Sequence, residues 1–324
     1  MKQQKFIERN EALWHEIERL IAHLEKPRRQ ALDEGDSLAR FPALYRRLCQ
    51  HYAVALKRHY SPHLVNRLHR LVVRGHNRLY SVRTEWWRDL LDTVSRRFPR
   101  LLRANASLFW LAAALFYLPG IVTGVLSYLD GDLIYSVMPD QAVAHMESMY
   151  DPAARQPGRE SGRESDTDFE MFGFYILNNI SIGFRTFASG LLLGIGSGLI
   201  LLYNGLVIGS VAGHLTQLGF TSTFWPFVSG HSSLELTAIV ICGTAGLMLA
   251  RAIFRPGQVT RSQALVREGK DAVVLVSGAA LMLVLAAFVE AFWSSSGLPP
   301  LLKYIVSGLL WLLVIGYLLL AGRR

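Results

Sequence analysis

The stretch SGLLLGIGSGLILLYNGLVIGSVAGHL, residues 189–215, decides the fold of this chain, because it combines an apolar sequence with two glycine ladders. Glycine recurs at every fourth position in each ladder, first at Gly190, Gly194 and Gly198, and then at Gly205, Gly209 and Gly213. Such spacing gives a helix a flat face that lets another backbone approach closely, as helices do when they associate in lipid. The stretch therefore predicts two membrane helices packed as a compact hairpin, with a break at Asn204.

The composition of the whole chain also indicates a membrane protein. Of its 324 residues 51% are hydrophobic, and the mean hydropathy is +0.25. Six apolar segments approach the roughly 20 residues that a spanning helix needs. They are residues 105–128, 180–203, 204–219, 231–250, 272–293 and 301–321. We expect an all-α polytopic membrane protein with about six transmembrane helices; the third segment is short enough to be re-entrant, so five spans are the alternative.

The distribution of charge predicts how these spans are oriented, because cytoplasmic segments of membrane proteins carry an excess of Lys and Arg. Residues 1–103 hold 22 basic and 11 acidic residues, whereas residues 127–170 hold 3 basic and 10 acidic ones. The segment 251–271 and the end of the chain are basic again. This charge distribution predicts six spans in the cytoplasmic (inner) membrane, with both termini in the cytoplasm. The formal net charge of +9 then reflects topology, and we expect no nucleic-acid partner.

Two domains are expected along the chain. Residues 1–103 are polar, with apolar residues at helical spacing, and predict a soluble cytoplasmic helical bundle. The last part of this domain, from Trp86 to Arg103, mixes aromatic residues with arginines and predicts an amphipathic juxtamembrane helix. Residues 104–324 form the transmembrane domain, with an acidic extracytoplasmic loop at about 129–170.

The membrane domain holds polar residues that need an explanation, because charged groups inside spans are costly and usually pair with one another or line a cavity. The candidates for a functional polar cluster are His231, Glu235, His214, Arg185, Glu290 and Asn204. His231 and Glu235 are four residues apart and share one helix face. On the six-span topology the five ionisable candidates lie in the outer half of the bilayer. They predict either structural pairs that lock the bundle, Arg185 with a glutamate, or a functional cavity.

The chemistry of this cluster has several interpretations. His231, Glu235 and His214 offer two imidazoles and a carboxylate to a metal, but no HExxH-type sequence accompanies them, so we expect no metal and no cofactor. Ser232 and Ser233 lack the Gly-x-Ser-x-Gly context of a serine nucleophile, and we expect no catalytic residue. A transport path remains open, since broken spans beside polar groups are typical of transporters.

At these residues the chain resembles a known family. It is similar to the stage II sporulation protein M family of integral membrane proteins in three segments: Asn204-Gly205 with Gly209, Gly230-His231-Ser232-Ser233-Leu234-Glu235-Leu236-Thr237-Ala238, and Ala245-Gly246-Leu247. The resemblance covers about residues 170–320. It departs from the family pattern at Ser232 and Thr237, where glycine and proline are common.

The resemblance implies a role in a membrane complex rather than an established reaction. In spore formers the namesake works with peptidoglycan-degrading proteins, and relatives are often encoded beside MoxR-type ATPases. We therefore expect a non-enzymatic scaffold or complex subunit in envelope assembly or remodelling. Its partners would be the lipid bilayer and proteins such as cell-wall enzymes or a cytoplasmic ATPase. The alternative is a transporter or channel-like protein that uses the polar cluster.

Overall fold

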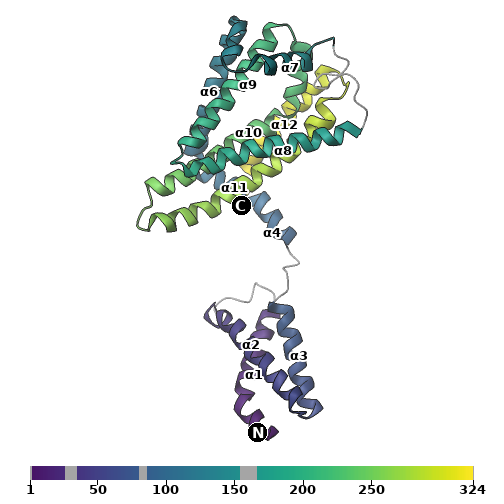
Figure 1. Cartoon of the computed structure of the whole chain (residues 1–324), viewed down its shortest axis with the longest axis vertical. Coiled ribbons are helices and arrows are strands. Elements are labelled where there is room, and N and C mark those ends of the chain that lie inside the picture. The colour runs from purple at the N-terminus through teal and green to yellow at the C-terminus, as the bar shows by residue number, and fades with distance from the viewer. Residues whose placement is uncertain (1, 26–34, 80–85, 154–165, 324) are drawn as a thin grey trace. The chain divides into compact units, whose positions relative to one another are not determined.

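The computed structural model describes residues 2–25, 35–79, 86–153 and 166–323, and the regular elements of these ranges are helices (Figure 1). The middle of the predicted acidic loop, residues 154–165, lies outside the described residues. The chain divides into two compact units, Met1–Arg88 and Asp89–Arg324. The predicted fold class, a helical region followed by a bundle of membrane helices, is confirmed.

The N-terminal unit consists of α1 (Gln3–Glu25), α2 (Gly35–Lys57) and α3 (Pro62–Leu79). Apolar residues recur along these helices at the spacing of one face. They meet in a core in which Trp14 and Leu48 are completely buried. The unit therefore has a hydrophobic core of its own, as an independent domain requires.

The membrane unit is built from long helices. They are α6 (Ala106–Leu129), α8 (Asp166–Ala188), α9 (Ile195–Gln217), α10 (Thr221–Phe254), α11 (Arg261–Phe288) and α12 (Pro300–Leu320). Within the described residues, five helices are long and apolar enough to cross a membrane: α6, α9, α10, α12, and α11 with its extension to Ser294. α8 carries Asn178, Asn179 and Arg185 and is not among these five.

The long helices alternate in direction, which brings three distant segments to one end of the membrane unit (Figure 1). Arg103, just before α6, donates hydrogen bonds to the carbonyl oxygens of Leu318 (2.6 Å) and Ala321 (2.7 Å) at the end of α12. Arg251, near the end of α10, donates to Asn105 Oδ1 at 2.7 Å. The start of α6, the end of α10 and the end of α12 therefore lie together, and we call this the basic end of the unit.

The acidic segment that follows α6 lies at the other end of the membrane unit (Figure 1). It contains a short 3-10 helix, η3 (Gly131–Ser136), and α7 (Asp140–Tyr150). The apolar side chains of both pack against the end of α9 and the start of α10, with Ile134 and Val143 completely buried. We call this the acidic end.

The predicted boundary between the second and third spans is wrong. The segments expected at 180–203 and 204–219 are instead α8 and α9, and the break between them ends at Gly194 rather than at Asn204. Leu193 and Gly194 have φ angles of 57° and 78°, a left-handed conformation that a right-handed helix cannot continue. α9 is therefore a full span of 23 residues, about 35 Å long at 1.5 Å per residue, and no short re-entrant segment is needed.

The second glycine ladder packs α9 against α6. A side chain at any of its three positions would overlap a carbonyl oxygen of α6, the atoms involved being those of Phe116 for Gly205, Gly120 for Gly209 and Gly124 for Gly213. Because α6 itself presents glycine at two of these contacts, the two backbones touch directly. Close backbone contact of this kind is the packing expected of helices in lipid.

The first ladder does not form a helix face, because it spans the break between α8 and α9. Gly190 lies against the backbone of Gly246 in α10, whereas Gly198 has only the tip of Leu115 nearby. The predicted hairpin between the two ladders is therefore wrong. The close partner of α9 is α6, which precedes it by more than sixty residues.

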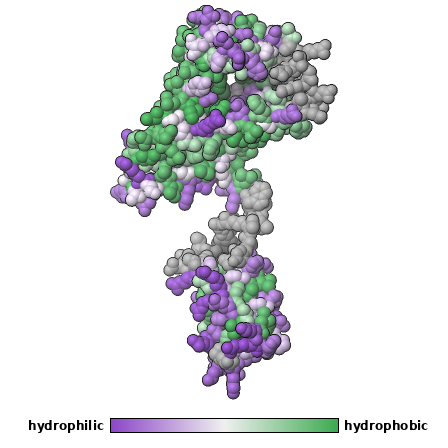
Figure 2. All heavy atoms as spheres, viewed as in Figure 1, coloured by the Kyte–Doolittle hydropathy of each residue, from purple (hydrophilic) through white to green (hydrophobic). Residues whose placement is uncertain are grey.

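α10 is the central helix of the membrane unit. Most of its 34 residues are buried, and it contacts α6, α8, α9, α11 and α12. The outer helices are apolar on their exposed faces, as Figure 2 shows for one side of the molecule. Leu118 of α6 and Leu312 of α12 are 62% and 70% exposed. Continuous exposed apolar surface of this kind is the surface that contacts lipid.

The predicted juxtamembrane helix is made of α4 (Trp86–Asp92), a π-helical turn η2 (Thr93–Arg97) and α5 (Phe98–Ala104). Phe98 and Leu102 are buried in the core of the membrane unit. Arg97 pairs with Asp271 at 3.2 Å, and Arg103 binds the last carbonyls of α12 as described above. These arginines therefore contact the basic end of the unit itself, where a cation at a helix C-terminus is favourable.

Candidate functional site

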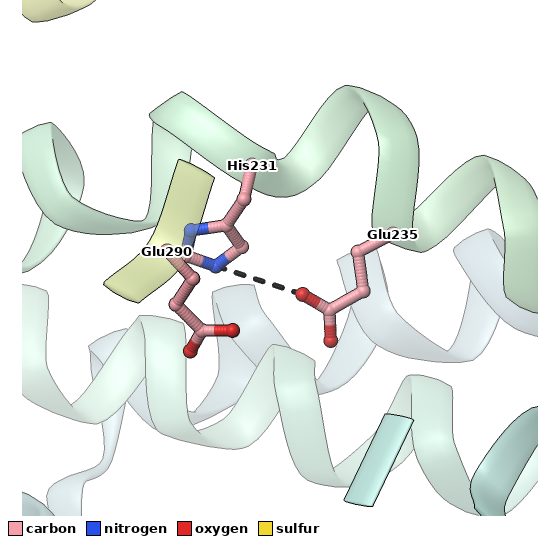
Figure 3. A group of neighbouring side chains, drawn as sticks. All are labelled: His231, Glu235 and Glu290. Atoms are coloured by element: carbon pink, nitrogen blue, oxygen red, sulfur yellow. Dashed lines mark ion pairs between the residues drawn. The ribbon is translucent and has the colours of Figure 1, made fainter. Parts of the chain in front are cut away.

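Three of the predicted residues, His231, Glu235 and Glu290, come together inside the membrane unit. One nitrogen or oxygen atom from each lies within 4.8 Å of those of the other two. His231 Nε2 is 3.6 Å from Glu235 Oε2, and the two side chains are 7% and 18% exposed. Figure 3 shows the three side chains converging on one small volume. We call these three residues the His–Glu–Glu cluster.

Two kinds of helix position the His–Glu–Glu cluster. His231 and Glu235 are one turn apart on α10, so both project from the same face. Glu290 lies in η5 (Val289–Ser294), a π-helical turn that continues α11. Such turns occur often at functional sites, because the extra residue moves side chains out of the regular helical register. The same turn carries Ser294.

Hydrogen bonds hold both the imidazole and the π-helical turn in place. His231 Nδ1 is 3.2 Å from Ser294 Oγ, and the ring lies edge-on to Phe227 with 5.6 Å between centroids. Lys303 of α12 donates to the carbonyl oxygens of Ser294 and Ser296, both at 2.7 Å. Because Nδ1 is engaged by Ser294, Nε2 is the ring nitrogen directed to the carboxylates.

Several buried polar atoms in and beside the cluster have no hydrogen-bond partner among the described residues. They include Glu290 Oε2, Trp293 Nε1 and Asn179 Nδ2. Asn179 of α8 adjoins Glu290, and Trp293 follows it on the π-helical turn. Since buried polar atoms are nearly always paired with protein, water or an ion, the cluster has spare capacity to bind a small polar or charged species.

Tyr150, the last residue of α7, connects the acidic end to the His–Glu–Glu cluster. Its ring packs edge-on against Phe224 (5.2 Å) and Phe227 (5.7 Å), and Thr223 Oγ1 donates to its carbonyl oxygen. Burial, together with the nearby carboxyl of Glu290, raises the pKa of the Tyr150 phenol well above its usual value. The phenol is therefore neutral and lies within electrostatic reach of the cluster.

The five ionisable residues expected to form one cluster do not all come together. His214, predicted beside His231, instead pairs with Glu147 of α7, with Nε2 2.7 Å from Glu147 Oε1. That contact lies at the acidic end, where Glu147 is 34% exposed. The third member of the predicted metal-ligand set is therefore replaced by Glu290, and His214 belongs to a separate pair.

Arg185 and Asn204 also lie apart from the cluster. Arg185 is in the last turn of α8, and the adjacent Thr186 packs on Gly246, which is eleven residues and about 16 Å along α10 from Glu235. No ion pair joins Arg185 to Glu235 or Glu290 within the described part of the chain, so the expected structural pair is wrong. Asn204 lies inside α9, where its Nδ2 donates to the Ile200 carbonyl at 2.8 Å.

A groove of about 600 Å³ opens on a different face of α10, between α6, α9 and α12. Its lining is apolar apart from a few hydroxyl groups, and it includes Gly120, Gly209, Ser232 and Trp311. None of the three cluster residues lines it. The glycine-lined surface and the His–Glu–Glu cluster are therefore two separate features rather than parts of one path.

Sequence reasoning missed the residues that support the cluster. Ser294 follows Glu290 at the same four-residue spacing as Glu235 follows His231, and this repeated spacing was the available signal. Lys303 and Asn179 reach the site from other helices, and nothing in their local sequence marks them. Their roles follow only from the packing of α8 and α12.

Comparison with protein-family models matches two parts of the chain. The model for stage II sporulation protein M matches residues 113–295, which is more than half of the chain and includes the whole His–Glu–Glu cluster. A model described as a domain of unknown function (DUF8413) matches residues 4–81, within the N-terminal unit. Comparison with curated proteins and with solved structures gave no match. The chain is therefore a multi-pass membrane protein that belongs to the stage II sporulation protein M family.

Proposed function

We propose that this protein is a non-enzymatic subunit of a membrane complex that takes part in envelope assembly or remodelling, with its N-terminal unit recruiting a cytoplasmic protein. The observation that carries this proposal is the separate core of the N-terminal unit. A unit that buries its own apolar residues keeps its polar surface available for a partner. The membrane unit then serves to anchor that partner at the bilayer.

The charge distribution of the N-terminal unit supports an acidic partner. Residues 40–79, which include most of α2 and all of α3, contain nine Lys and Arg residues and no Asp or Glu. Four of the basic residues with exposed side chains are Arg46, Lys57, Arg58 and Arg70. A surface of one sign attracts a surface of the other and speeds their encounter. The expected partner is therefore a cytoplasmic protein with an acidic face, an ATPase being the class that the resemblance suggests.

Brief crosslinking in the native membrane, followed by affinity purification and mass spectrometry, tests this function. Wild type should recover a cytoplasmic protein in near-stoichiometric amount, and replacing Arg46, Lys57, Arg58 and Arg70 by Glu should abolish that recovery. The matched control replaces four exposed basic residues in or next to α1, namely Lys2, Lys5, Arg9 and Arg19. Equal recovery from both variants, or from a chain without residues 2–79, would contradict the proposal.

The scaffold requires the N-terminal unit to be cytoplasmic, and the ends of the membrane unit support that orientation. Arg103, Arg251 and Arg255 are at or near the basic end, whereas the other end carries Asp140 and Glu147. Lys and Arg predominate on the cytoplasmic side of membrane proteins. Single cysteines placed at position 140 and at position 257 should be labelled by an impermeant maleimide from opposite sides of the membrane.

A transport or channel-like function is the second candidate, and the His–Glu–Glu cluster favours it. Ionisable residues buried among spanning helices often mark ion or proton pathways. Purified protein in liposomes should then carry protons or cations in response to a gradient, and Glu235→Gln should abolish the flux while Glu147→Gln preserves it. Absence of flux from folded wild-type protein would eliminate this candidate and leave the scaffold.

A further inference from the structure

We propose that His231 Nε2 and one carboxylate oxygen each from Glu235 and Glu290 form a binding site for a divalent first-row metal cation, with Zn²⁺ the best match. This site is independent of the scaffold function, because it requires only the membrane unit. The sequence alone gave no metal-binding motif, since its third ligand comes from a helix 55 residues further along the chain.

The geometry of the three ligand atoms fits a small cation. Two atoms bound about 2.1 Å from a tetrahedral Zn²⁺ lie about 3.4 Å apart. His231 Nε2 and Glu235 Oε2 are already 3.6 Å apart, and all three atoms lie within 4.8 Å of one another. Reducing the largest of these separations to about 3.4 Å requires the Glu290 carboxylate to move by no more than about 1.4 Å.

The His–Glu–Glu cluster contains more acidic groups than basic ones. Two carboxylates face one imidazole in the interior of the membrane unit, and among the residues that the structure describes no Lys or Arg forms an ion pair with Glu235 or Glu290. Lys303 of α12, which binds the supporting turn, is engaged by two carbonyl oxygens. Buried charges of one sign are stable when they are paired or when they coordinate a metal. A divalent cation balances both carboxylates at once.

The surroundings of the ligands are those of a metal site. His231 Nδ1 is held by Ser294 Oγ at 3.2 Å, and a metal-binding histidine characteristically uses its second nitrogen in this way. Within the part of the chain that the structure describes, Glu290 Oε2 is buried without a hydrogen-bond partner, and the side chain of Asn179 adjoins the Glu290 carboxyl group. These two observations are independent of the distances between the ligand atoms. The first leaves His231 Nε2 available to a cation, and the second leaves a Glu290 oxygen available.

The chemical types of the three ligand atoms indicate which metal the site binds. One imidazole nitrogen and two carboxylate oxygens suit Zn²⁺ and its neighbours Mn²⁺, Fe²⁺ and Co²⁺, whereas Ca²⁺ and Mg²⁺ prefer oxygen alone. Cys242 supplies no ligand, because it is eleven residues from His231 on α10 and packs against Gly183 of α8. Zn²⁺ is favoured because three protein ligands leave a fourth tetrahedral position for water.

The first experiment measures Zn²⁺ binding to the full chain in lipid nanodiscs, by competition with a fluorescent chelator. Wild type should bind one equivalent, and Glu290→Gln should weaken binding at least 100-fold. The matched control is Glu147→Gln, which removes the carboxylate of the other His–Glu pair and should change the affinity less than threefold. Failure of wild type to bind more Zn²⁺ than the Glu235→Gln/Glu290→Gln double variant would overturn the proposal, as would an equal loss in the control.

A second experiment needs no variant and so does not depend on whether Glu290→Gln folds. X-ray absorption of the Zn²⁺-loaded wild type should give nitrogen and oxygen neighbours at about 2.0–2.1 Å with the outer-shell scattering of a single imidazole. Sulfur in the first shell, two imidazoles, or none would overturn the assignment. Loading should also raise the midpoint of thermal unfolding, since a ligand that binds only the folded state stabilises it, and a midpoint unchanged by stoichiometric loading would count against a site in the folded bundle.

Discussion

The membrane unit contains two His–Glu pairs, and their difference shows what residue identity alone does not determine. His214 and Glu147 come from different helices, lie 2.7 Å apart and sit where the carboxylate still reaches solvent. His231 and Glu235 come from one helix, lie 3.6 Å apart, are more deeply buried and are joined by a third group, Glu290. The first joins one imidazole nitrogen to one carboxylate. The second contains two carboxylates for one imidazole, so it can bind a further cation.

The largest difference should appear when the imidazole is removed from each pair. His231→Leu leaves the Ser294 hydroxyl and two buried carboxyl groups without their polar neighbour, and we expect a loss of about 3 kcal/mol in the free energy of unfolding, the upper end of the cost of unsatisfied buried polar groups. His214→Leu leaves Glu147 partly hydrated, and we expect about 1 kcal/mol. Reversible denaturation of the purified chain in mixed detergent micelles measures both. Equal losses would show that the two pairs do not differ in kind.

The next largest effect is expected for the π-helical turn η5, which places Glu290 beside His231 and Glu235. Lys303→Met removes two hydrogen bonds from a buried ammonium to the carbonyls of Ser294 and Ser296, and we expect a loss of about 2 kcal/mol. Hydrogen exchange should rise in η5 and stay constant in α7. Lys270→Met, on an exposed side chain, is the control. Unchanged exchange in η5 would mean that Lys303 does not hold the turn.

A smaller effect isolates the hydrogen bond to the second ring nitrogen of His231. Ser294→Ala should lower the free energy of unfolding by about 1 kcal/mol, the usual contribution of one such bond. Combined with His231→Leu, it should add nothing further, whereas combined with His214→Leu the two losses should add. If the losses in the free energy of unfolding add in both double variants, Ser294 does not act together with His231.

The smallest effect concerns a histidine outside the membrane unit, His51. Its ring is hydrogen-bonded to an indole rather than paired with a carboxylate. Trp14 Nε1 donates to His51 Nδ1 at 3.2 Å, and burial, with a smaller contribution from Arg47, holds the pKa of His51 below 6.5. The unfolded chain therefore binds a proton first, so this contribution to stability is present above about pH 6.5 and is lost as the pH falls below it. Hydrogen exchange in α1 and α2, corrected for intrinsic rates, should increase between pH 7 and 5.5.

His51→Gln serves as the control for that measurement, because it removes the titrating group while keeping a polar side chain. Its exchange rates should be independent of pH over the same range. A wild-type N-terminal unit that is equally protected at both pH values would contradict the assignment of a neutral His51 that accepts the Trp14 hydrogen bond.

Much of the fold follows from the apolar runs in the sequence. The first and last spans were predicted within one residue of α6 and α12, because charged or helix-ending residues flank both apolar runs. The error in the middle came from Asn204-Gly205, which looks like a break but lies inside α9. Two adjacent residues with left-handed backbone, Leu193 and Gly194, form the actual break. Several glycines in this region leave the local sequence without a clear preference.

The error at that break accounts for most of the error at the site. Moving the break from 204 to 194 shifts α8 towards the N-terminus, which carries Arg185 to the basic end and away from the glutamates. His231 and Glu235 were unaffected, since their spacing on one helix does not depend on depth. The contributions of Ser294 and Lys303 were out of reach, because a π-helical turn and a contact between two helices leave no periodic signal.

The hydrogen bonds from Arg103 to the end of α12 have a consequence for how the protein is made. The two partners Arg103 and Ala321 are 218 residues apart, so at 5–20 residues per second the ribosome needs about 10–40 s to deliver the second after the first. Throughout that interval the Arg103 guanidinium lacks these two acceptors. These two hydrogen bonds therefore form only after the last helix is complete, and a chain that ends before α12 leaves the Arg103 guanidinium without them.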